Sequence, residues 1–401
     1  MSLRQIIEQE IRERGPIPFS RYMELCLYHP ELGFYSRNLE AFGRAGDFYT
    51  SSDVHPVFGR LLARQFDEIW RVFGSPEQIE IVELGPGRGL FAQDVLEWSR
   101  KFPQFFHALH YSLVESSPAL SQRLRVTLSG HFDAGKASLC GAGPPGTGSM
   151  VRSEVWVEQR CSAASKSHPG RALASEVPVI IFANEFFDAL PVEILSPQGA
   201  LRISVQGNRF IETWVPPSAE ELGFLDRHSV HPDWGERIEV PLVAHRYMSE
   251  LAAAVRRGVI IAIDYGFTCQ QQLAGRHRGT LMAYRRHSAS PNPYEAPGEQ
   301  DLTAHANFTA LAAAAEENGM QVRPLLTQSQ FLMGIGEKNQ FADAFEECRL
   351  PQERAKVALQ LKHLVTPVGM GESFQVLVAG KGVDTEDVAG LSGLSFARSG
   401  L

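Results

Sequence analysis

The residues best suited to chemistry are an amide and two carboxylates, Asn184, Glu185 and Asp188, which follow an apolar run at 178–184. A buried strand there would deliver these side chains to its carboxyl end, where open α/β sheets bind ligands. Glu185 and Asp188 are three residues apart, so on a helical turn they would share a face. Two such carboxylates can grip a guanidinium and accept a proton from it. The alternative is that Asp188 only caps a helix and Glu185 ends a strand in solvent.

A glycine-rich turn provides a second candidate site, for a nucleotide-type cofactor. Gly85, Gly87 and Gly89 lie between an apolar run at 79–84 and a helical segment, where glycines let a cofactor approach the backbone. The third glycine comes one position too early for the dinucleotide pattern G-x-G-x-x-G. The carboxylate of Glu83 would also repel a negatively charged pyrophosphate, whereas it suits the cationic groups of S-adenosylmethionine (SAM). SAM is therefore favoured, with a dinucleotide or a plain strand–turn–helix connection as alternatives.

Glu115 ends the second apolar run, HYSLVE at 110–115. A carboxylate at this point can accept hydrogen bonds from both ribose hydroxyls of a cofactor. A helix-capping or solvent-facing glutamate is the alternative. The glycine-rich turn upstream favours the ribose role.

These residues need a sheet to position them, and the chain supplies short apolar runs that alternate with helical segments. The runs are IEIVEL at 79–84, HYSLVE at 110–115, PVIIFAN at 178–184, GVIIAID at 258–264, GTLMAY at 279–284 and FQVLVAG at 374–380. Runs that are apolar on both faces are typical of a mostly parallel sheet covered by helices on both sides. The sequence thus predicts a doubly wound, Rossmann-like α/β domain.

The pattern predicts three parts. Residues 1–78 form a helical extension, with an amphipathic helix at 2–14 and a loop at 43–53. Residues 79–381 form the α/β domain. The tail at 382–401 has little to bury and is expected to fray.

Two insertions interrupt the α/β domain. Residues 133–175 are rich in Gly, Ser, Ala and Pro, which predicts a poorly ordered surface segment around one short strand at 155–158. Residues 192–240 contain alternating apolar positions, which predict an inserted β-hairpin.

Composition limits the class of partner. The chain has 401 residues, a formal net charge of −8 and five scattered cysteines. A nucleic-acid or membrane-surface binder usually carries a basic excess, so neither is expected as the main partner. The cysteines lack any CxxC pair, which fits a reducing compartment. The chain has no apolar stretch of about 18 residues to span a membrane.

Other polar residues are weaker candidates. Asn307 is predicted to cap the helix FTALAAAAEENG, and His305 beside it is expected to be structural rather than catalytic. Tyr265 either borders the substrate cleft or packs in the core. Metal-ligand spacing is absent, so no metal is expected.

The sequence resembles the MidA family, whose mitochondrial member is a protein-arginine methyltransferase involved in assembly of respiratory complex I. The matching segments span almost the whole chain: PIPFSRYMELCLYHPELGFYS at 16–36, GDFYTSSDVHPVFG at 46–59, VELGPGRGLFAQDVL at 82–96, LVESSPAL at 113–120, ANEFFDALPVEIL at 183–195, IDYG at 263–266, PGEQDLTAHANFTAL at 297–311, TQSQFLMGIG at 327–336 and GMGESFQVLVAGK at 369–381.

The resemblance implies a class I methyltransferase fold with added helices and an inserted hairpin. It implies SAM as methyl donor and protein arginine side chains as acceptors, dimethylated symmetrically in the mitochondrial case. By position, the residues beside SAM would be Gly46, Asp47, Thr50, Ser51, Glu83, Gly85, Gly87, Gly89 and Glu115. The reaction centre would hold Asn184, Glu185 and Asp188.

This sequence departs from the family at Ser52-Asp53-Val54, where members usually read PEIS after GDFxTS, so the contour of that loop stays open. The N-terminus begins at the family's first helix, which favours a bacterial cytoplasm unless a mitochondrial presequence precedes it. The acceptor stays open, with a respiratory-complex subunit as one candidate, and so does assembly, with a homodimer as one option. Competing functions are a nicotinamide-dependent oxidoreductase, a non-catalytic SAM-binding assembly factor and a methyltransferase acting on a small molecule.

Overall fold

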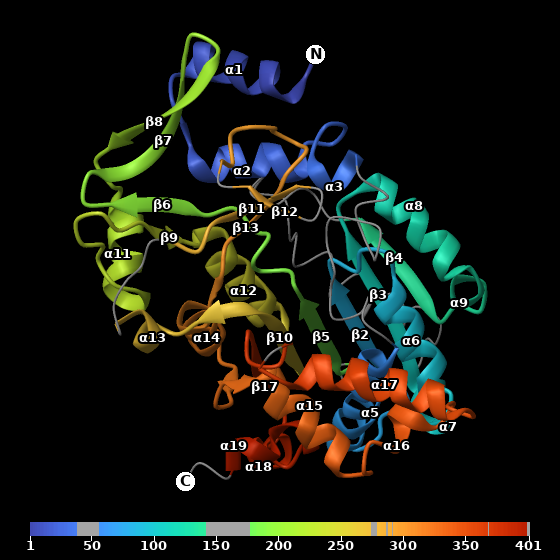
Figure 1. Cartoon of the computed structure of the whole chain (residues 1–401). Coiled ribbons are helices and arrows are strands. Elements are labelled where there is room, and N and C mark those ends of the chain that lie inside the picture. The colour runs from blue at the N-terminus through green and yellow to red at the C-terminus, as the bar shows by residue number, and fades with distance from the viewer. Residues whose placement is uncertain are drawn as a thin grey trace, which may run out of the picture.

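A twisted sheet of nine strands forms the centre of the molecule (Figure 1). The computed structural model describes residues 1–37, 56–141, 177–273, 279–285, 288–290, 292–367 and 369–398. The strand order is β15-β17-β10-β5-β2-β3-β4, with β14 beside β10 and β16 beside β17. The bounds are β2 Ile79–Leu84, β3 Leu109–Glu115, β4 Ala137–Gly141, β5 Val179–Asn184, β10 Gly258–Phe267, β14 Ala306–Asn307, β15 Gln321–Val322, β16 Leu326–Thr327 and β17 Phe374–Lys381.

Five successive strands of this sheet, β4, β3, β2, β5 and β10, run parallel, and β17 is antiparallel to β10. Parallel strands bring their carboxyl ends to one edge of the sheet. The ends of β2, β3, β5 and β10 carry the candidate site residues, so the topology collects them at that edge.

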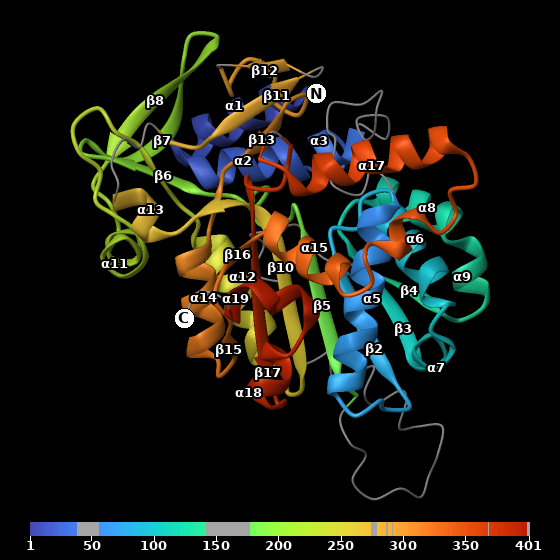
Figure 2. The same cartoon turned by 60° about the horizontal axis from the view of Figure 1, so that its bottom comes forward.

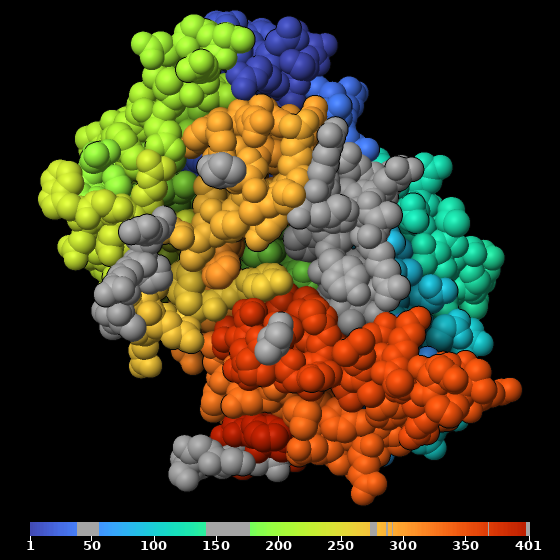
Figure 3. All heavy atoms as spheres, in the orientation of Figure 1, coloured from blue at the N-terminus to red at the C-terminus, as the bar shows by residue number. Residues whose placement is uncertain are grey.

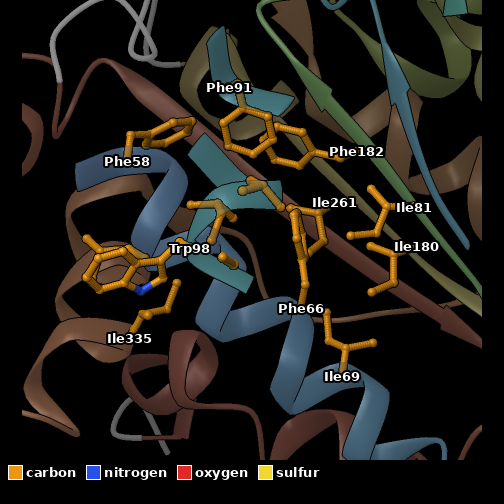
Figure 4. Close-up of a cluster of buried hydrophobic side chains, with 14 of the residues drawn as sticks. Phe58, Phe66, Ile69, Ile81, Phe91, Trp98, Ile180, Phe182, Ile261 and Ile335 are labelled. Carbon is orange, nitrogen blue, oxygen red and sulfur yellow. The ribbon is translucent and has the colours of Figure 1, made fainter. Parts of the chain in front are cut away.

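Helices cover both faces of the sheet because successive strand residues point to opposite sides. Ile81 and Phe182 face the larger hydrophobic core, which α5 and α6 cover, whereas Val82 and Ile181 face the core under α12 and α14. Figure 4 shows Phe182 stacked on Phe91, with ring centroids 4.5 Å apart. The covering helices are α5 Val57–Val72, α6 Leu90–Ser99, α12 Leu242–Ala254 and α14 Phe308–Glu317.

A second sheet joins the N-terminal segment to the insertion at 192–240. In it, β7 and β8 form the hairpin that the alternating residues predict, and β7 also pairs with β1 and β6. Helices α1 and α2 pack against this sheet (Figure 2). The bounds are β1 Ile17–Pro18, β6 Glu193–Ser196, β7 Gly199–Gln206, β8 Arg209–Val215, β9 Ile238–Val240, α1 Leu3–Arg14, α2 Phe19–Tyr28, α3 Phe34–Arg37 and α11 Ala219–His228.

The remaining elements lie around the two sheets. A small sheet has the order β12-β11-β13, and no helix among the described residues is long and apolar enough to cross a membrane. The bounds are β11 Met282–Arg285, β12 Ser288–Ser290, β13 Asp301–Thr303, α7 Pro103–Ala108, α8 Pro118–Thr127, α9 Ser129–Asp133, α13 Cys269–Leu273, α15 Gln328–Glu337, α16 Ala342–Phe345, α17 Pro351–Val365, α18 Thr385–Ala389, η1 Ser392–Leu394 and α19 Ser395–Arg398.

Two strand predictions need correction. The run at 279–284 contributes β11, which pairs with β12 and β13 rather than joining the main sheet. The segment at 133–175 was expected to lie on the surface, yet its residues 137–141 form β4, the edge strand beside β3. The predicted strand at 155–158 lies outside the described residues. The first error arises because an apolar run shows that a strand forms but not which neighbour it pairs with, and the second because β4 is too weakly apolar to be recognised.

The expectation that the tail frays from residue 382 is wrong for Thr385–Arg398. Val388, Leu391 and Leu394 are buried in the larger hydrophobic core. The backbone N–H of Gly393 also donates to Gln65 Oε1 at 2.8 Å, which ties η1 to α5. Three apolar residues spread over a Ser- and Gly-rich stretch are enough to dock it.

Candidate active site

The candidate acceptor site is a turn at residues 184–188, which we call the acidic turn, at the carboxyl end of β5. It is not the helical turn on which Glu185 and Asp188 would share a face. Glu185 has a φ of 51°, in the left-handed region that residues with a Cβ rarely adopt. Its backbone N–H donates to the carbonyl oxygen of Ile263 at 2.9 Å, which continues the pairing of β5 with β10.

Asp264, at the neighbouring position on β10, organises this turn. Its Oδ2 accepts hydrogen bonds from the backbone N–H groups of Phe186, Phe187 and Asp188 at 3.1, 2.8 and 3.2 Å. Three successive N–H groups that converge on one anion form a concave binding site for negative charge. The sequence predicts the strand that ends at Asp264 but not this role of its side chain, since 76 to 78 residues separate the partners.

Negative charge accumulates at the acidic turn. Asp188 and Asp264 are 3% and 0% exposed. Burial, and then the charge of Asp264, raise the pKa of Asp188 well above its usual value. Burial and the charge of Glu185 raise the pKa of Asp264 to about 7. A cation bound here would stabilise the ionised carboxylates against both burial and their mutual repulsion.

The amide of Asn184 belongs to the same turn. Its Nδ2 donates to Glu185 Oε1 at 3.1 Å. Its Oδ1 is buried and, among the described residues, accepts no hydrogen bond. Because a buried polar atom without a partner is costly, this oxygen is available to a donor supplied by a ligand.

Residues from the N-terminal helices close one side of the turn. Tyr28 Oη donates to the carbonyl oxygen of Ala189 at 2.9 Å, and Tyr35 Oη donates to Asp301 Oδ1 at 3.0 Å. Asp301 is 1% exposed, and its charge also raises the pKa of Asp188. Sequence analysis did not single out these three residues, although each lies within a segment that carries the family resemblance.

Tyr265 borders the turn on the other side. Its ring lies 3.9 Å from that of Phe374 and stacks on that of His305 at 6.0 Å between centroids. Burial is the main cause that raises its pKa, and the charges of Glu185 and Asp188 add to it. Tyr265 therefore packs in the core and also faces the carboxylates. Asn307 caps α14 as predicted, because its side chain accepts from the N–H of Ala310 at 3.0 Å.

The glycine-rich turn lies against the acidic turn. Gly85, Gly87 and Gly89 have φ values of 62°, 51° and 78°, which glycine adopts without strain. A Cβ on Gly85 would lie 3.1 Å from Cδ2 of Phe186, whereas one on Gly89 would lie 2.7 Å from Cδ2 of Leu124. Gly85 thus allows close approach of the two turns, and Gly89 allows α8 to pack.

Two buried carboxylates flank the glycine-rich turn. Glu83 is 5% exposed and accepts a hydrogen bond from Tyr111 Oη at 2.9 Å, yet burial raises its pKa to about 8. Burial raises the pKa of Glu115 to about 7, although hydrogen bonds from the N–H groups of Ser116 and Ser117 act to lower it. Among the described residues, no positive side chain contributes to either shift.

These carboxylates fit SAM, which carries an ammonium group, a sulfonium and two ribose hydroxyls. A cationic ligand would stabilise the ionised form of Glu83, and ribose hydroxyls could donate to Glu115. Four predicted cofactor residues, Gly46, Asp47, Thr50 and Ser51, lie outside the described residues. No group of three or more His, Cys, Asp or Glu side chains in the described ranges could hold a metal ion.

Figure 3 shows where this edge of the sheet reaches the surface. Green and yellow atoms are visible between the orange segment around β11–β13 and the red-orange segment around α17. A parallel sheet with a glycine-rich turn after its first strand and acidic residues at its carboxyl edge defines a protein of the Rossmann-like class with a site for a nucleotide-type cofactor.

Comparison with known proteins identifies the family. Residues 61–325 match the family described as S-adenosyl-L-methionine-dependent methyltransferase, and the chain belongs to it. A Drosophila melanogaster relative, named protein arginine methyltransferase NDUFAF7 homolog, mitochondrial, is 30% identical over 95% of this chain and 85% of its own length. The Homo sapiens protein arginine methyltransferase NDUFAF7, mitochondrial, is 26% identical over 91% of this chain and 80% of its own.

A crystal structure from Burkholderia thailandensis is similar throughout. That protein is bound to S-adenosyl-homocysteine, is 26% identical, and superposes with a TM-score of 0.77 over 98% of this chain and 94% of its own. The chain is therefore a SAM-dependent methyltransferase with the predicted fold. Family membership decides the cofactor in favour of SAM over a dinucleotide and confirms the predicted MidA relationship.

Proposed function

We propose that this protein transfers methyl groups from SAM to arginine side chains of a protein substrate, with the acidic turn as acceptor site. The observation that carries the proposal is a group of three carboxylates, half-buried Glu185 and buried Asp188 and Asp264, that lies beside the glycine-rich turn. A site that raises the pKa of its own acids favours a cationic acceptor. Relatives across most of the chain are named protein arginine methyltransferases, which supports the same acceptor.

A guanidinium suits this site better than a neutral acceptor. Its planar fork of N–H donors can bind the carboxylates of Glu185 and Asp188 together, which would fix the direction of one terminal nitrogen. The Oδ1 of Asn184 offers a further acceptor for a guanidinium N–H. Orientation of this kind supplies a large part of the rate in a bimolecular transfer.

The reaction is a displacement at carbon. When bound, SAM supplies a methyl group on a positively charged sulfur. A terminal nitrogen of the arginine forms a bond to the methyl carbon while the carbon–sulfur bond breaks, and one N–H proton leaves the guanidinium. Glu185 or Asp188 accepts that proton, so the methylated guanidinium keeps a single positive charge.

Apolar side chains shield the turn from water. Phe187 is 2% exposed, and the ring of Phe186 packs on that of Tyr247 with centroids 5.1 Å apart. A dry site strengthens the attraction between a guanidinium and the carboxylates. Phe186 also contacts the glycine-rich turn, so the two halves of the site share one wall.

We assign the cofactor contacts in the same proposal. Glu83 balances the positive charge of SAM and Glu115 accepts from its ribose hydroxyls. Gly85, Gly87 and Gly89 expose the backbone between them. Gly46, Asp47, Thr50 and Ser51 complete the cofactor site by resemblance to the family.

One finer proposal, the acceptor, rests on the resemblance to the family; the location and the assembly are predictions from the sequence, and the named relatives are mitochondrial. We propose a respiratory-complex subunit as acceptor, the bacterial cytoplasm as location and a homodimer as assembly. We also keep the predicted organisation of a helical extension, 1–78, and a SAM-binding domain, 79–381.

The test is transfer of labelled methyl groups from SAM to proteins of the source cell's extract, followed by mass spectrometry of the labelled protein. We expect the label on an arginine side chain. Glu185→Gln and Asp188→Asn should each lower the initial rate by about 100-fold or more, because a charged hydrogen bond to the acceptor is lost. Binding of S-adenosyl-homocysteine should stay within about threefold.

The matched control is Asp67→Asn. This carboxylate is also buried and also has a pKa raised by burial, but it lies on α5, away from both turns. Its rate should match that of the unmodified protein. Label on lysine or on a small molecule would refute the acceptor, and unchanged labelling in both site variants would refute the catalytic assignment. SAM binding without any transfer would favour the assembly-factor alternative.

A further inference from the structure

We propose that Asp264 is a positioning residue for methyl transfer: it holds the acidic turn in its active shape and does not itself contact the acceptor. This inference rests on the proposed function for the identity of the reaction. The structural part concerns only how the turn is held.

The turn depends on Asp264 for its backbone hydrogen bonds. The N–H groups of Phe186, Phe187 and Asp188 all donate to the same oxygen, Oδ2. Buried N–H groups without an acceptor are strongly disfavoured, and no other acceptor for these three is recorded among the described residues. Removal of this carboxylate would therefore leave three successive donors to find new partners.

The turn also holds a disfavoured conformation that needs such support. Glu185 has a φ of 51°, and residues with a Cβ keep positive φ only where surrounding contacts enforce it. The N–H of Glu185 is fixed to Ile263 on one side, and the three N–H groups after it are fixed to Asp264. These hydrogen bonds to β10 thereby fix the backbone of Glu185, and with it the direction in which its side chain leaves the turn.

The hydrogen bonds of Asp264 to three backbone N–H groups separate its role from those of Glu185 and Asp188. Asp264 has no exposed surface, and its Oδ2 is committed to the turn. Its Oδ1 is buried and has no hydrogen-bond partner among the described residues. A guanidinium bound to Glu185 and Asp188 would feel the charge of Asp264 without displacing its Oδ2 from the three N–H groups of the turn.

The same charge acts on the titration of the site. The ionisable groups around Asp264 are Glu185 and Asp188 on the turn, Asp301 on β13 and Tyr265 on its own strand. Asp264 raises the pKa of Asp188 by repulsion between like charges. Asparagine at this position would keep an oxygen for the three N–H groups but remove the repulsion.

Hydrogen exchange, followed by mass spectrometry, tests the positioning directly and needs no acceptor. We expect Asp264→Ala to speed exchange in peptides that cover 183–190 by about tenfold or more, because each lost hydrogen bond to a charged group is worth more than a neutral one. Asp264→Asn should change it less, and Asp67→Asn should leave it unchanged. Binding of S-adenosyl-homocysteine to all three should stay within about threefold.

Label transfer from SAM to extract protein gives the functional readout. Asp264→Ala should lower the initial rate by about 100-fold, the loss that misplacement by about 1 Å can cause. Asp264→Asn should stay within about tenfold, and the acid limb of its pH–rate profile should move to lower pH. A purely structural role would not move that limb.

The proposal is wrong if exchange at 183–190 is the same in Asp264→Ala as in the unmodified protein. It is also wrong if the Ala and Asn variants are equally slow with unchanged pH profiles. If Asp264→Ala fails to fold, hydrogen exchange at 183–190 and the pH–rate profile are measured on Asp264→Asn alone. Label found on a residue other than arginine would overturn the proposed acceptor but leave the exchange result, and hence the positioning role, intact.

Discussion

Protons released on SAM binding give the sharpest prediction for the cofactor half of the site. The carboxyl of Glu83 is buried, and burial raises its pKa to about 8. At pH 7 about 0.9 of this group is protonated, given a pKa of about 8. If SAM places positive charge near Glu83, binding favours the ionised form, and the proton must leave.

The direction and size of the pH dependence of SAM affinity follow from the pKa of Glu83. Observed affinity scales with the ionised fraction of Glu83, so it should rise as pH rises toward 8 and then level off. Between pH 6.5 and 7.5 the affinity for SAM should rise about eightfold, for a folded pKa of about 8. Glu115, with a pKa of about 7, would add up to about half a proton at pH 7 if the ribose hydroxyls favour its ionised form.

Calorimetry in buffers of different ionisation enthalpy measures the number of protons released. The amino group of SAM itself begins to lose its proton near pH 7.8, the usual pKa of an α-amino group, so the measurements belong between pH 6 and 7.5. Comparison with Glu83→Gln removes any contribution of the ligand. We expect release of about 0.9 proton or more at pH 7 in the unmodified protein and about half or less in the variant.

Tyr111→Phe provides a second, independent check. The hydroxyl of Tyr111 donates to Glu83 and lowers its pKa, so its removal should raise that pKa further and weaken binding at pH 7. The pH at which affinity levels off should then move upward. Identical pH dependence in Glu83→Gln and the unmodified protein would refute the electrostatic role of Glu83.

The remaining predictions concern stability and are read from denaturant unfolding. Gly89→Ala should cost about 2 kcal/mol because a left-handed residue gains a Cβ that meets a leucine, whereas Gly135→Ala, with open space, should cost about 1 kcal/mol. Equal losses would contradict the packing role. Leu394→Ala should cost about 2–5 kcal/mol if the C-terminal segment is part of the core, against about 0.5 or less for exposed Leu359→Ala. Asn307→Ala should cost about 1–2 kcal/mol through loss of the α14 cap; no loss would contradict that role.

Sequence alone predicts the parallel core of the fold because its strands are buried on both faces. The runs at 79–84, 110–115, 178–184 and 258–264 all become neighbours in the central sheet. The hairpin of β7 and β8 is also visible, because apolar and polar residues alternate along both segments. The spacing of apolar residues shows which side chains are buried, and all of these strands bury side chains.

Pairing partners are much harder to predict. The run at 279–284 is apolar enough for the main sheet, yet β11 pairs with β13, and β4 completes the sheet with a weakly apolar segment. The C-terminal segment docks through Val388 and Leu394, which are isolated in a polar stretch. These outcomes depend on which surface is left uncovered after the core has formed, and no local pattern encodes that.

The site shows the same division. Carboxylates that directly follow strands, such as Glu185 and Glu115, can be placed at the edge of the sheet from spacing alone. The links between elements cannot, because the hydrogen bonds of Asp264 to the turn and of Tyr35 to Asp301 join residues far apart in the chain. The spacing of Glu185 and Asp188 would place them on one face of a helical turn, but the structure has a left-handed residue at Glu185.

A crystal structure with S-adenosyl-homocysteine and an arginine-containing acceptor peptide tests the central claim most directly. The account predicts that the guanidinium lies between the carboxylates of Glu185 and Asp188, with one terminal nitrogen directed at the sulfur of the cofactor. A guanidinium bound elsewhere, or an acidic turn filled by the protein's own side chains, would contradict it.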